Sequence, residues 1–445
     1  MEGYMMKISL VGGGGYAWTP MLMTNFITNP FFNGSRVCLM DINEEALAQT
    51  SSACRKILAA SADSRLIIET TTDLDIALKG ADYVIVAIAH GGIRPEVEDL
   101  RIGRQYGYFN MGGEEVGVSG CSRTLRHVPE IVRIARRMEE LCPDAEFLNV
   151  SNPLTALTRS INKYTGIKGY GFCHGVVNHL SPMFPLFGAD SWEGVDFNVA
   201  GVDHCSWLLD IRYKGQDALA IMREKGLIDL ANQGRLNVMA DDPFANREQL
   251  RLRFMLWGIL GYMPAISDRH IIEFFAQIIG RQEYRDFFGV DSNFDRPTEK
   301  LEWAERYKDE VLNVAAGKKK PSLNRSAEIV DRFICAREGG GSFIDVMNVP
   351  NVGQVPNLPL ESVVETKCFV DATGVHPVIA GPLPPVIESI VRPIIIRQEL
   401  YMEAAMENSF EKLRAALSTD PLVGDFRHLD EMCRELLDYN SQFKK

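Results

Sequence analysis

A run of glycines near the start of the chain is the first segment whose composition suits ligand binding. The apolar stretch Lys7–Val11 is followed by Gly12, Gly13, Gly14 and Gly15. With Ala17 they fit the pattern G-x-G-x-x-G/A, whose glycines allow a tight turn and a close approach of phosphate to the backbone. A strand before the loop and a helix from about Pro20 are the setting in which this pattern binds a dinucleotide. A glycine-rich turn without a ligand is the alternative interpretation.

A carboxylate stands at the end of the second apolar stretch. Arg36–Met40 is predicted as a strand, and Asp41 follows it directly. A carboxylate there accepts hydrogen bonds from ribose hydroxyls and repels the 2′-phosphate of NADP. The sequence therefore predicts an NAD site formed by the glycine run and Asp41.

Polar groups also follow three later predicted strands. They are Asn152 after strand 146–150, Cys173 and His174 at the end of strand 169–173, and His204 after strand 197–202. Because the carboxyl ends of parallel strands line the ligand crevice of a doubly wound sheet, these side chains could converge. A thiolate and an imidazole can bind a metal, although their spacing is not that of a zinc finger. A small buried cysteine and a structural histidine stay open as the simpler interpretation.

Asp268 admits both a catalytic and a structural interpretation. It lies in the segment Ser267-Asp-Arg-His270, before the apolar helix predicted for Ile271–Ile279. An aspartate at such a position commonly caps the helix that follows. It is also a candidate for acid–base chemistry, and the sequence leaves both roles open.

The elements that must position these groups alternate between strands and helices, which is typical of a doubly wound α/β sheet of the Rossmann type. The run Ala81–Ala89 is almost wholly apolar, as expected for a strand buried on both faces. Helices are predicted for Glu44–Ala62 and Val128–Leu141. This layout is that of the lactate and malate dehydrogenases.

The pattern changes near residue 195. Phe197–Val202 and Leu208–Tyr213 are predicted as strands that pair antiparallel, and long helices follow. An irregular stretch is expected over Val346–Pro359, and two helices over Val386–Tyr439. We therefore expect an NAD-binding Rossmann domain over residues 1–195 and an α+β substrate and metal domain over residues 196–445.

The composition narrows the class of protein. The chain has 445 residues, and its net charge of −12 and pI near 5.3 argue against a nucleic-acid partner, which would need a basic face. Its nine cysteines follow no repeating spacing and no secretory signal is visible, which predicts reduced thiols and a cytoplasmic location. The most apolar run, Phe254–Ile266, is too short to span a membrane and contains Pro264, so a buried helix is expected.

Taken in order, these segments resemble glycoside hydrolase family 4, the NAD- and manganese-dependent glycosidases. The resemblance includes the glycine run before Tyr16-Ala-Trp-Thr-Pro20, segment 112–125, Asn152-Pro153, Cys173-His174-Gly175, Asp203-His204, segment 267–273 and segment 351–359. It covers most of the chain. There are two departures: segment 113–117 differs from the form common in the family, and Asp203 stands where an asparagine is usual.

The resemblance implies a role for each candidate residue. Cys173 and His204 would hold Mn²⁺, and Asn152 would contact the sugar. His174 matches the proton donor and Asp268 the proton acceptor, although some members use a tyrosine as base. If Asp268 only caps a helix, Tyr262 is the nearest tyrosine in sequence.

The implied mechanism differs from that of two-carboxylate glycosidases. NAD oxidises C3 of the sugar, and the resulting ketone acidifies the C2 proton, which a base removes. The metal polarises the ketone oxygen, and a general acid helps to expel the aglycone. Water then adds and NADH returns its hydride, so that NAD is recycled.

The residue after the Cys-His pair, Gly175, indicates which sugar the enzyme binds. Glycine after the Cys-His pair resembles the α-glucuronidase group, and it leaves space and no negative charge where a uronate carboxylate must fit. Arg94, Arg123 and Arg269 are candidate partners for that carboxylate. The alternatives are an α-galacturonidase, α-glucosidase or α-galactosidase of the same family, or an NAD-dependent hydroxy-acid dehydrogenase. By the same resemblance we expect a homodimer or homotetramer.

Overall fold

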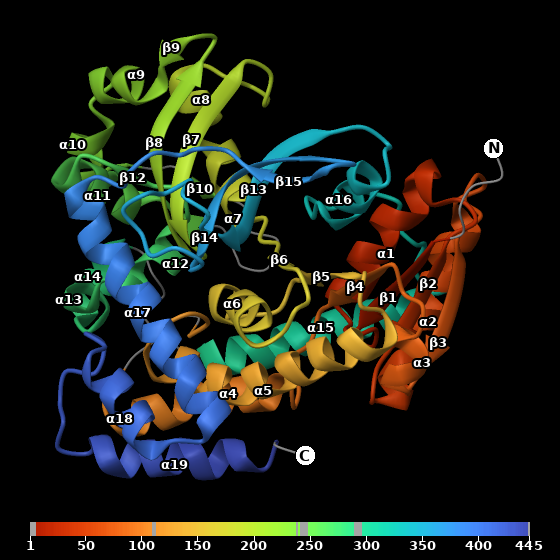
Figure 1. Ribbon diagram of the computed structural model, residues 1–445. Helices are drawn as coiled ribbons and strands as arrows, with labels where there is room; N and C mark the ends of the chain where they lie inside the picture. Colours follow the sequence, from red (N-terminus) through yellow and green to blue (C-terminus); the bar gives the residue numbers. More distant parts are fainter. Residues whose placement is uncertain (1–5, 109–112, 237–238, 241–247, 289–295, 444–445) are drawn as a thin grey trace.

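The computed structural model describes residues 6–108, 113–236, 239–240, 248–288 and 296–443. Gly112, which opens one of the family-like segments, lies outside the described residues, as do residues 1–5 of the opening segment. Figure 1 shows the described chain as a long twisted sheet with helices packed along it.

One half of this sheet is parallel. Its strands are β1 (Lys7–Val11), β2 (Arg36–Met40), β3 (Ile67–Thr71), β4 (Tyr83–Val86), β5 (Glu146–Asn149) and β6 (Gly169–Gly171). They lie in the order β3-β2-β1-β4-β5-β6, and every neighbouring pair is parallel. This is the strand order of a dinucleotide-binding sheet, and it confirms the Rossmann-type fold.

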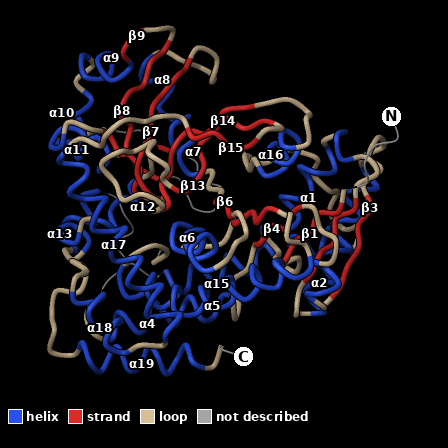
Figure 2. The backbone as a smooth tube through the Cα atoms, in the orientation of Figure 1, coloured by secondary structure: helices blue, strands red, loops and turns tan. Residues whose placement is uncertain are grey.

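The other half continues the same sheet with antiparallel strands. They are β13 (Phe343–Pro350), β14 (Val363–Asp371), β7 (Val195–Val202), β8 (Cys205–Tyr213) and β12 (Met263–Pro264), with β15 (Gly374–Pro377) and β9 (Gln216–Asp217) paired at the side. The predicted antiparallel pairing of β7 and β8 is confirmed. The two halves join where β13 pairs with β6, so the strands form one band across the molecule (Figure 2).

Helices cover both faces of the parallel half. On one face α1 (Trp18–Thr28), α2 (Glu44–Ala60) and α16 (Val330–Arg337) pack on side chains such as Leu10 and Ile85. On the other, α3 (Leu74–Leu78), α5 (Gly117–Leu141) and α6 (Leu154–Tyr164) pack on Val84 and Val86. Adjacent residues of one strand thus reach opposite cores, which explains why these strands are apolar throughout.

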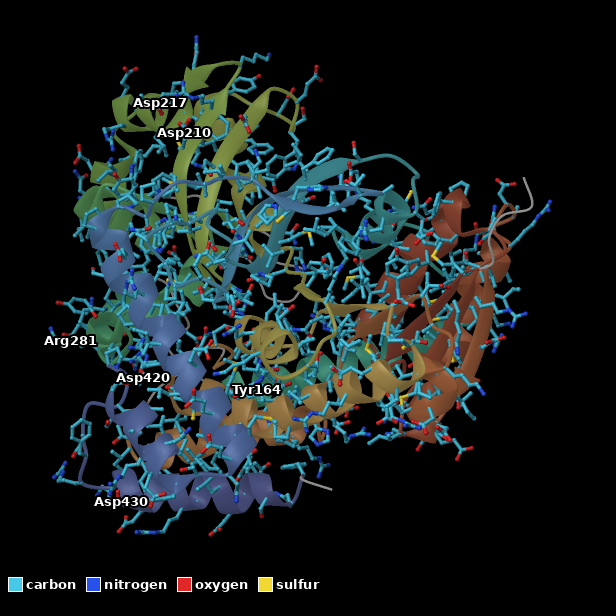
Figure 3. All side chains as sticks on the ribbon, in the orientation of Figure 1. Tyr164, Asp210, Asp217, Arg281, Asp420 and Asp430 are labelled. Carbon is cyan, nitrogen blue, oxygen red and sulfur yellow. The ribbon has the colours of Figure 1, made fainter. Side chains whose placement is uncertain are left out.

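The last helices of the chain return to the first half of the fold. Helices α17 (Pro385–Glu407), α18 (Phe410–Ser418) and α19 (Leu429–Ser441) share the core beneath α5. Asp420, labelled in Figure 3, accepts hydrogen bonds from the Gly117 amide at 3.0 Å and the Tyr401 hydroxyl at 2.8 Å. Its carboxylate therefore anchors the first turn of α5.

The other described α-helices fall between residues 93 and 315. They are α4 (Ile93–Gln105), α7 (Gly175–Leu180), α8 (Phe184–Phe187), α9 (Ala218–Glu224), α10 (Leu227–Asn232), α11 (Arg251–Leu260), α12 (Asp268–Ile271), α13 (Ala276–Ile279), α14 (Gln282–Phe288) and α15 (Arg296–Ala315). Helix α15 packs on α2 and α4. Among the described residues, no helix has the length and apolarity that a membrane span requires.

Several boundaries differ from the sequence-based expectation. Part of the stretch expected to be irregular, 346–350, belongs to β13, and the tail forms three helices because Asn408 ends α17 in a left-handed conformation and Ser409 caps α18. The apolar helix expected at 271–279 is broken at Phe275. Helix α5 begins at Gly117 instead of Val128, and its first turns bury polar side chains such as Ser122 and Arg126 between the apolar ones.

Candidate active site

A cavity of about 380 Å³ opens at the carboxyl ends of the parallel strands. Its wall includes the end of the glycine loop, the segment after β4, Asn152, the Cys173–Gly175 segment and His204. One cavity thus connects the predicted dinucleotide loop with the predicted metal ligands.

The glycine loop is a tight turn that only small residues can form. Gly12 has a φ of 96°, and a Cβ on it would lie 2.2 Å from the Ala87 carbonyl oxygen. The amides of Gly12 and Gly13 both donate to the Met40 carbonyl, at 2.9 and 2.7 Å. The loop is therefore held against β2 and leads through Gly15 to α1, whose first residue, Trp18, lines the cavity.

Asp41 supports this loop. Its Oδ2 accepts from the Gly14 amide and its Oδ1 from the Asn43 amide, both at 2.9 Å. Asp41 is half-buried and is not among the residues that line the cavity. The contact of Asp41 with a ribose stays a prediction, and the structure adds a role in fixing the glycine loop.

Cys173 and His204 line the cavity and meet behind its wall with Asp203, which does not line it. The Cys173 sulfur, a ring nitrogen of His204 and a carboxylate oxygen of Asp203 all lie within 4.8 Å of one another. Burial, followed by the charge of Asp203, raises the pKa of the Cys173 thiol well above its usual value. Burial likewise raises the pKa of Asp203 to about 7. A thiol, an imidazole and a carboxylate are together a suitable donor set for a divalent cation.

His204 has a strained backbone at the tip of the hairpin between β7 and β8. Its φ is 60°, a left-handed conformation that glycine and asparagine adopt more easily than histidine. The imidazole reaches Asp203 through Nε2 at 3.5 Å and Glu114 through Nδ1 at 3.8 Å. The hairpin thus presents both ring nitrogens to charged groups, which is the arrangement of a ligand and its supporting carboxylate.

Glu114 links several groups of the cavity. It lies 3.4 Å from Arg123 and 3.7 Å from Lys300, and it accepts a hydrogen bond from Asn152 at 3.0 Å. Although burial opposes the shift, the charges of Lys300 and Arg123 hold the pKa of Glu114 well below its usual value. Asn152 is therefore fixed at the cavity wall by an ionised carboxylate.

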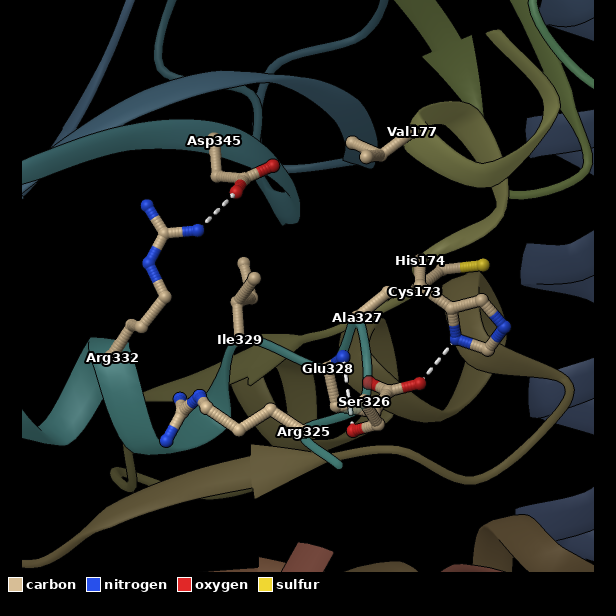
Figure 4. A pocket seen from close by; sticks show the side chains of 10 residues that line it. All are labelled: Cys173, His174, Val177, Arg325, Ser326, Ala327, Glu328, Ile329, Arg332 and Asp345. Carbon is tan, nitrogen blue, oxygen red and sulfur yellow. Dashed lines mark hydrogen bonds and ion pairs between the residues drawn. The ribbon is translucent and has the colours of Figure 1, made fainter. Parts of the chain in front are cut away.

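His174 is oriented by a buried carboxylate that the sequence did not indicate. Its Nδ1 is paired with Glu328, as Figure 4 shows, and the Glu328 side chain is only 3% exposed. A histidine whose Nδ1–H donates to a carboxylate keeps Nε2 for the opposite side. His174 borders both the main cavity and a smaller pocket of about 210 Å³, which Glu328 also lines.

Asp268 lies fully buried and is not among the residues that line the cavity. Its Oδ2 accepts from the Leu252 amide at 2.7 Å and its Oδ1 from the Arg253 amide at 2.9 Å. Its carboxylate thus caps α11, a helix that precedes it in the chain, and not the helix that follows. The role of Asp268 as base stays a prediction.

Helix α15 supplies a wall that sequence analysis missed. Lys300, Trp303 and Tyr307 line the cavity, spaced along one face of the helix. No motif marks this helix, and its packing on α2 and α4 brings it to the site. Of the three arginines considered for a uronate, Arg123 alone is among the lining residues.

Comparison with known families identifies the chain. Residues 7–186 match the family 4 glycosyl hydrolase model, and residues 199–423 match the model of the family's C-terminal domain. The chain belongs to family 4 of the glycosyl hydrolases. The resemblance inferred from the sequence is confirmed, and the protein is a glycosidase of that family.

Individual relatives differ in their sugar. An α-galactosidase of Bacillus subtilis is 30% identical over 441 residues, covering 97% of each chain. An α-galacturonidase of Thermoanaerobacterium saccharolyticum is 29% identical over 459 residues, covering 98% of this chain and 96% of the relative. α-Glycosidase activity is thus the shared description of these family members.

Solved structures agree with the fold. A 6-phospho-β-glucosidase of Thermotoga maritima, solved with manganese, NAD⁺ and glucose-6-phosphate, matches with a TM-score of 0.80 at 21% identity and covers 98% of this chain and 99% of its own. Malate dehydrogenase of Plasmodium falciparum matches with a TM-score of 0.52 at 13% identity, over 91% of this chain and 99% of its own. The dehydrogenase-like fold is confirmed.

Replacing His204 separates function from folding. In the metal-free protein, His204→Asn should raise the free energy of unfolding by up to about 1 kcal/mol, because asparagine relieves part of the left-handed strain. Binding of Mn²⁺, measured by titration calorimetry, should be lost. A variant less stable than wild type by chemical denaturation would show that the imidazole contacts outweigh the strain.

Replacing Asp268 tests its two roles. Asparagine cannot accept both α11 amides, so Asp268→Asn should cost about 1–3 kcal/mol of stability. If Asp268 is the base, the folded variant should also lose hydrolysis and the exchange of the sugar C2 proton with deuterated solvent, followed by NMR. Exchange and hydrolysis at wild-type rates would leave Asp268 as a cap only, and Tyr307, which lines the cavity, would be the tyrosine to replace next.

Proposed function

We propose that the protein hydrolyses α-linked hexuronides, with α-glucuronides as the first candidates, using NAD and Mn²⁺. The observation that carries this proposal is the single cavity that joins the glycine loop to Cys173 and His204. A relative of the same fold has been solved with both manganese and NAD⁺. The division into residues 1–195 and 196–445 and the cytoplasmic, homo-oligomeric state stay predictions.

The residues of this chain fit both cofactors. Cys173 and His204 would hold the metal, while the glycine loop and the start of α1 would hold the pyrophosphate of NAD. When bound, NAD takes up and returns a hydride at C3 of the sugar, and Mn²⁺ polarises the oxygen at that carbon. The chain must supply the remaining steps, which are sugar binding and proton transfer.

Asn152 and His174 are the groups placed for these steps. The Asn152 amide is held by Glu114 at 3.0 Å and would bind a sugar hydroxyl. Since Glu328 occupies Nδ1 of His174, Nε2 is the atom that can donate a proton to the departing aglycone. Glu328 also stabilises the positive charge that His174 carries before the transfer.

The uronate preference rests on Gly175 and on two cations. A Cβ at Gly175 would lie 2.6 Å from the Ile266 Cδ1 and 3.2 Å from the Cys173 sulfur, so a side chain would crowd the thiol. Arg123 and Lys300, 5% and 7% exposed, line the cavity, and Glu96 and Glu114 balance their charges. A uronate carboxylate would therefore meet a wall of no net charge with two cationic donors.

A second candidate is an α-galacturonidase. The relative at 29% identity from Thermoanaerobacterium saccharolyticum carries that name. Glucuronides and galacturonides differ only in the configuration at C4. Both place the same carboxylate at C5, so the contacts proposed for Arg123 and Lys300 serve either sugar.

The cofactor requirement gives a first test. Hydrolysis of a nitrophenyl α-glycoside should require added NAD and stop with EDTA, yet NADH absorbance should not accumulate, because the hydride returns within each turnover. As a control, activity should return when Mn²⁺ is added back after EDTA, which shows that the chelator did not damage the protein. NADH formed in equal amounts with product would identify a dehydrogenase instead.

The substrate preference is tested with one charge-removing variant. Lys300→Gln should lower kcat/KM for a nitrophenyl α-glucuronide or α-galacturonide at least about tenfold relative to a neutral α-glucoside, since a hydrogen bond to a charged group contributes about 1.5–3 kcal/mol. Arg94→Gln, at an exposed arginine outside the cavity wall, is the matched control. An unchanged ratio would exclude Lys300 as a uronate partner, and a wild-type enzyme that prefers neutral sugars would overturn the uronide assignment.

A further inference from the structure

Asp203 is a buried carboxylate without an internal partner of good geometry. It lies next to His204 at the tip of the β7–β8 hairpin and is 0% exposed. Neither carboxylate oxygen accepts a hydrogen bond from an N–H or O–H group of the described residues, and its polar neighbours are the Cys173 thiol and the His204 imidazole. Buried carboxylates are normally paired or bound to a metal, because losing hydration otherwise destabilises the fold.

The neighbours of this carboxylate are metal-binding groups. The Cys173 sulfur and a ring nitrogen of His204 lie within 4.8 Å of an Asp203 oxygen, and His204 Nε2 lies 3.5 Å from Oδ2. A thiolate and a carboxylate together supply two negative charges, which one divalent cation neutralises. The orphaned oxygens therefore lie where a cation would complete their coordination.

A second group of possible metal ligands lies nearby, but its carboxylate is already paired with cations. Glu114, His270 and His204 also place ligand atoms within 4.8 Å of one another. However, Glu114 already has Arg123 at 3.4 Å, Lys300 at 3.7 Å and the Asn152 amide at 3.0 Å. Its charge is compensated by two cations, whereas the described residues pair Asp203 only with the imidazole of His204.

We propose that Asp203 is a third protein ligand of the divalent metal, completing a thiolate, imidazole and carboxylate set with Cys173 and His204. This inference rests on the proposed function, which places the metal at Cys173 and His204. A carboxylate is a hard ligand that suits Mn²⁺, whereas a thiolate suits softer ions. Asp203 therefore shifts the preference of the site towards Mn²⁺.

The test is the metal affinity of Asp203→Asn, measured by titration calorimetry on the full-length protein with Mn²⁺ and, separately, Zn²⁺. The Mn²⁺ affinity should fall by at least about tenfold, the lower end of the effect of altering groups that support a metal site. The affinity for Zn²⁺, which binds thiolate and imidazole well, should fall less. Equal Mn²⁺ affinities of variant and wild type would overturn the proposal.

Glu365→Gln is the matched control. Glu365 is a second buried carboxylate close enough for its charge to interact with Asp203, but it already accepts hydrogen bonds from the Ser206 hydroxyl and the Asn348 amide. If Asp203 binds the metal directly, Glu365→Gln should change the Mn²⁺ affinity much less than Asp203→Asn. Equal losses in the two variants would show that overall negative charge, and not ligation, holds the ion.

A thermal measurement keeps the result independent of activity. Without metal, Asp203→Asn should melt at the same temperature as wild type or higher, because an unpaired buried charge is removed. The rise in Tm on adding Mn²⁺ should shrink. A lower metal-free Tm with an unchanged Mn²⁺ shift would make Asp203 a structural residue. Wild-type protein that neither binds Mn²⁺ nor hydrolyses glycosides would instead overturn the proposed function itself.

Discussion

The parallel alignment of β1, β4, β5 and β6 is the constraint on which the site depends. Because these strands run in one direction, the segments that follow them emerge at one edge of the sheet. The glycine loop, Asn152 and the Cys173–Gly175 segment are far apart in sequence and meet there without long connections. Reversing any one strand would carry its functional segment to the opposite edge.

The antiparallel half of the sheet supplies the remaining candidate metal ligands. The β7–β8 hairpin brings Asp203 and His204 to Cys173, and Thr155, near the start of α6, accepts a hydrogen bond from the Asp203 amide at 3.2 Å. Because the sheet is continuous through β6 and β13, the hairpin has a fixed position relative to the glycine loop. The left-handed backbone at His204 is the cost of placing an imidazole at so tight a turn.

Local sequence patterns predicted those site residues that come directly after a strand. Apolar runs ending in glycine, asparagine or cysteine marked β1, β5 and β6 correctly, so Cys173 and Asn152 could be placed at one edge. Glu328 and Lys300 could not be predicted, because each reaches the cavity through packing between distant segments. The contacts of Asp268 were missed for the same reason: its partners are the amides of α11, sixteen and fifteen residues earlier. Asn408-Ser409, by contrast, carried a local signal for a helix break that an apolar period alone did not show.

The anchoring of α5 by Asp420 has a consequence for biosynthesis. Arg123 lies on α5, and the first turn of that helix is fixed by Asp420, 303 positions after Gly117, with α17 and α19 packed along its length. On the ribosome, where domains fold from the N-terminus as the chain emerges, the parallel strands can pair early. The wall that carries Arg123 becomes complete only after Asp420 has been synthesised and has left the exit tunnel, so the site forms later than the parallel sheet beneath it.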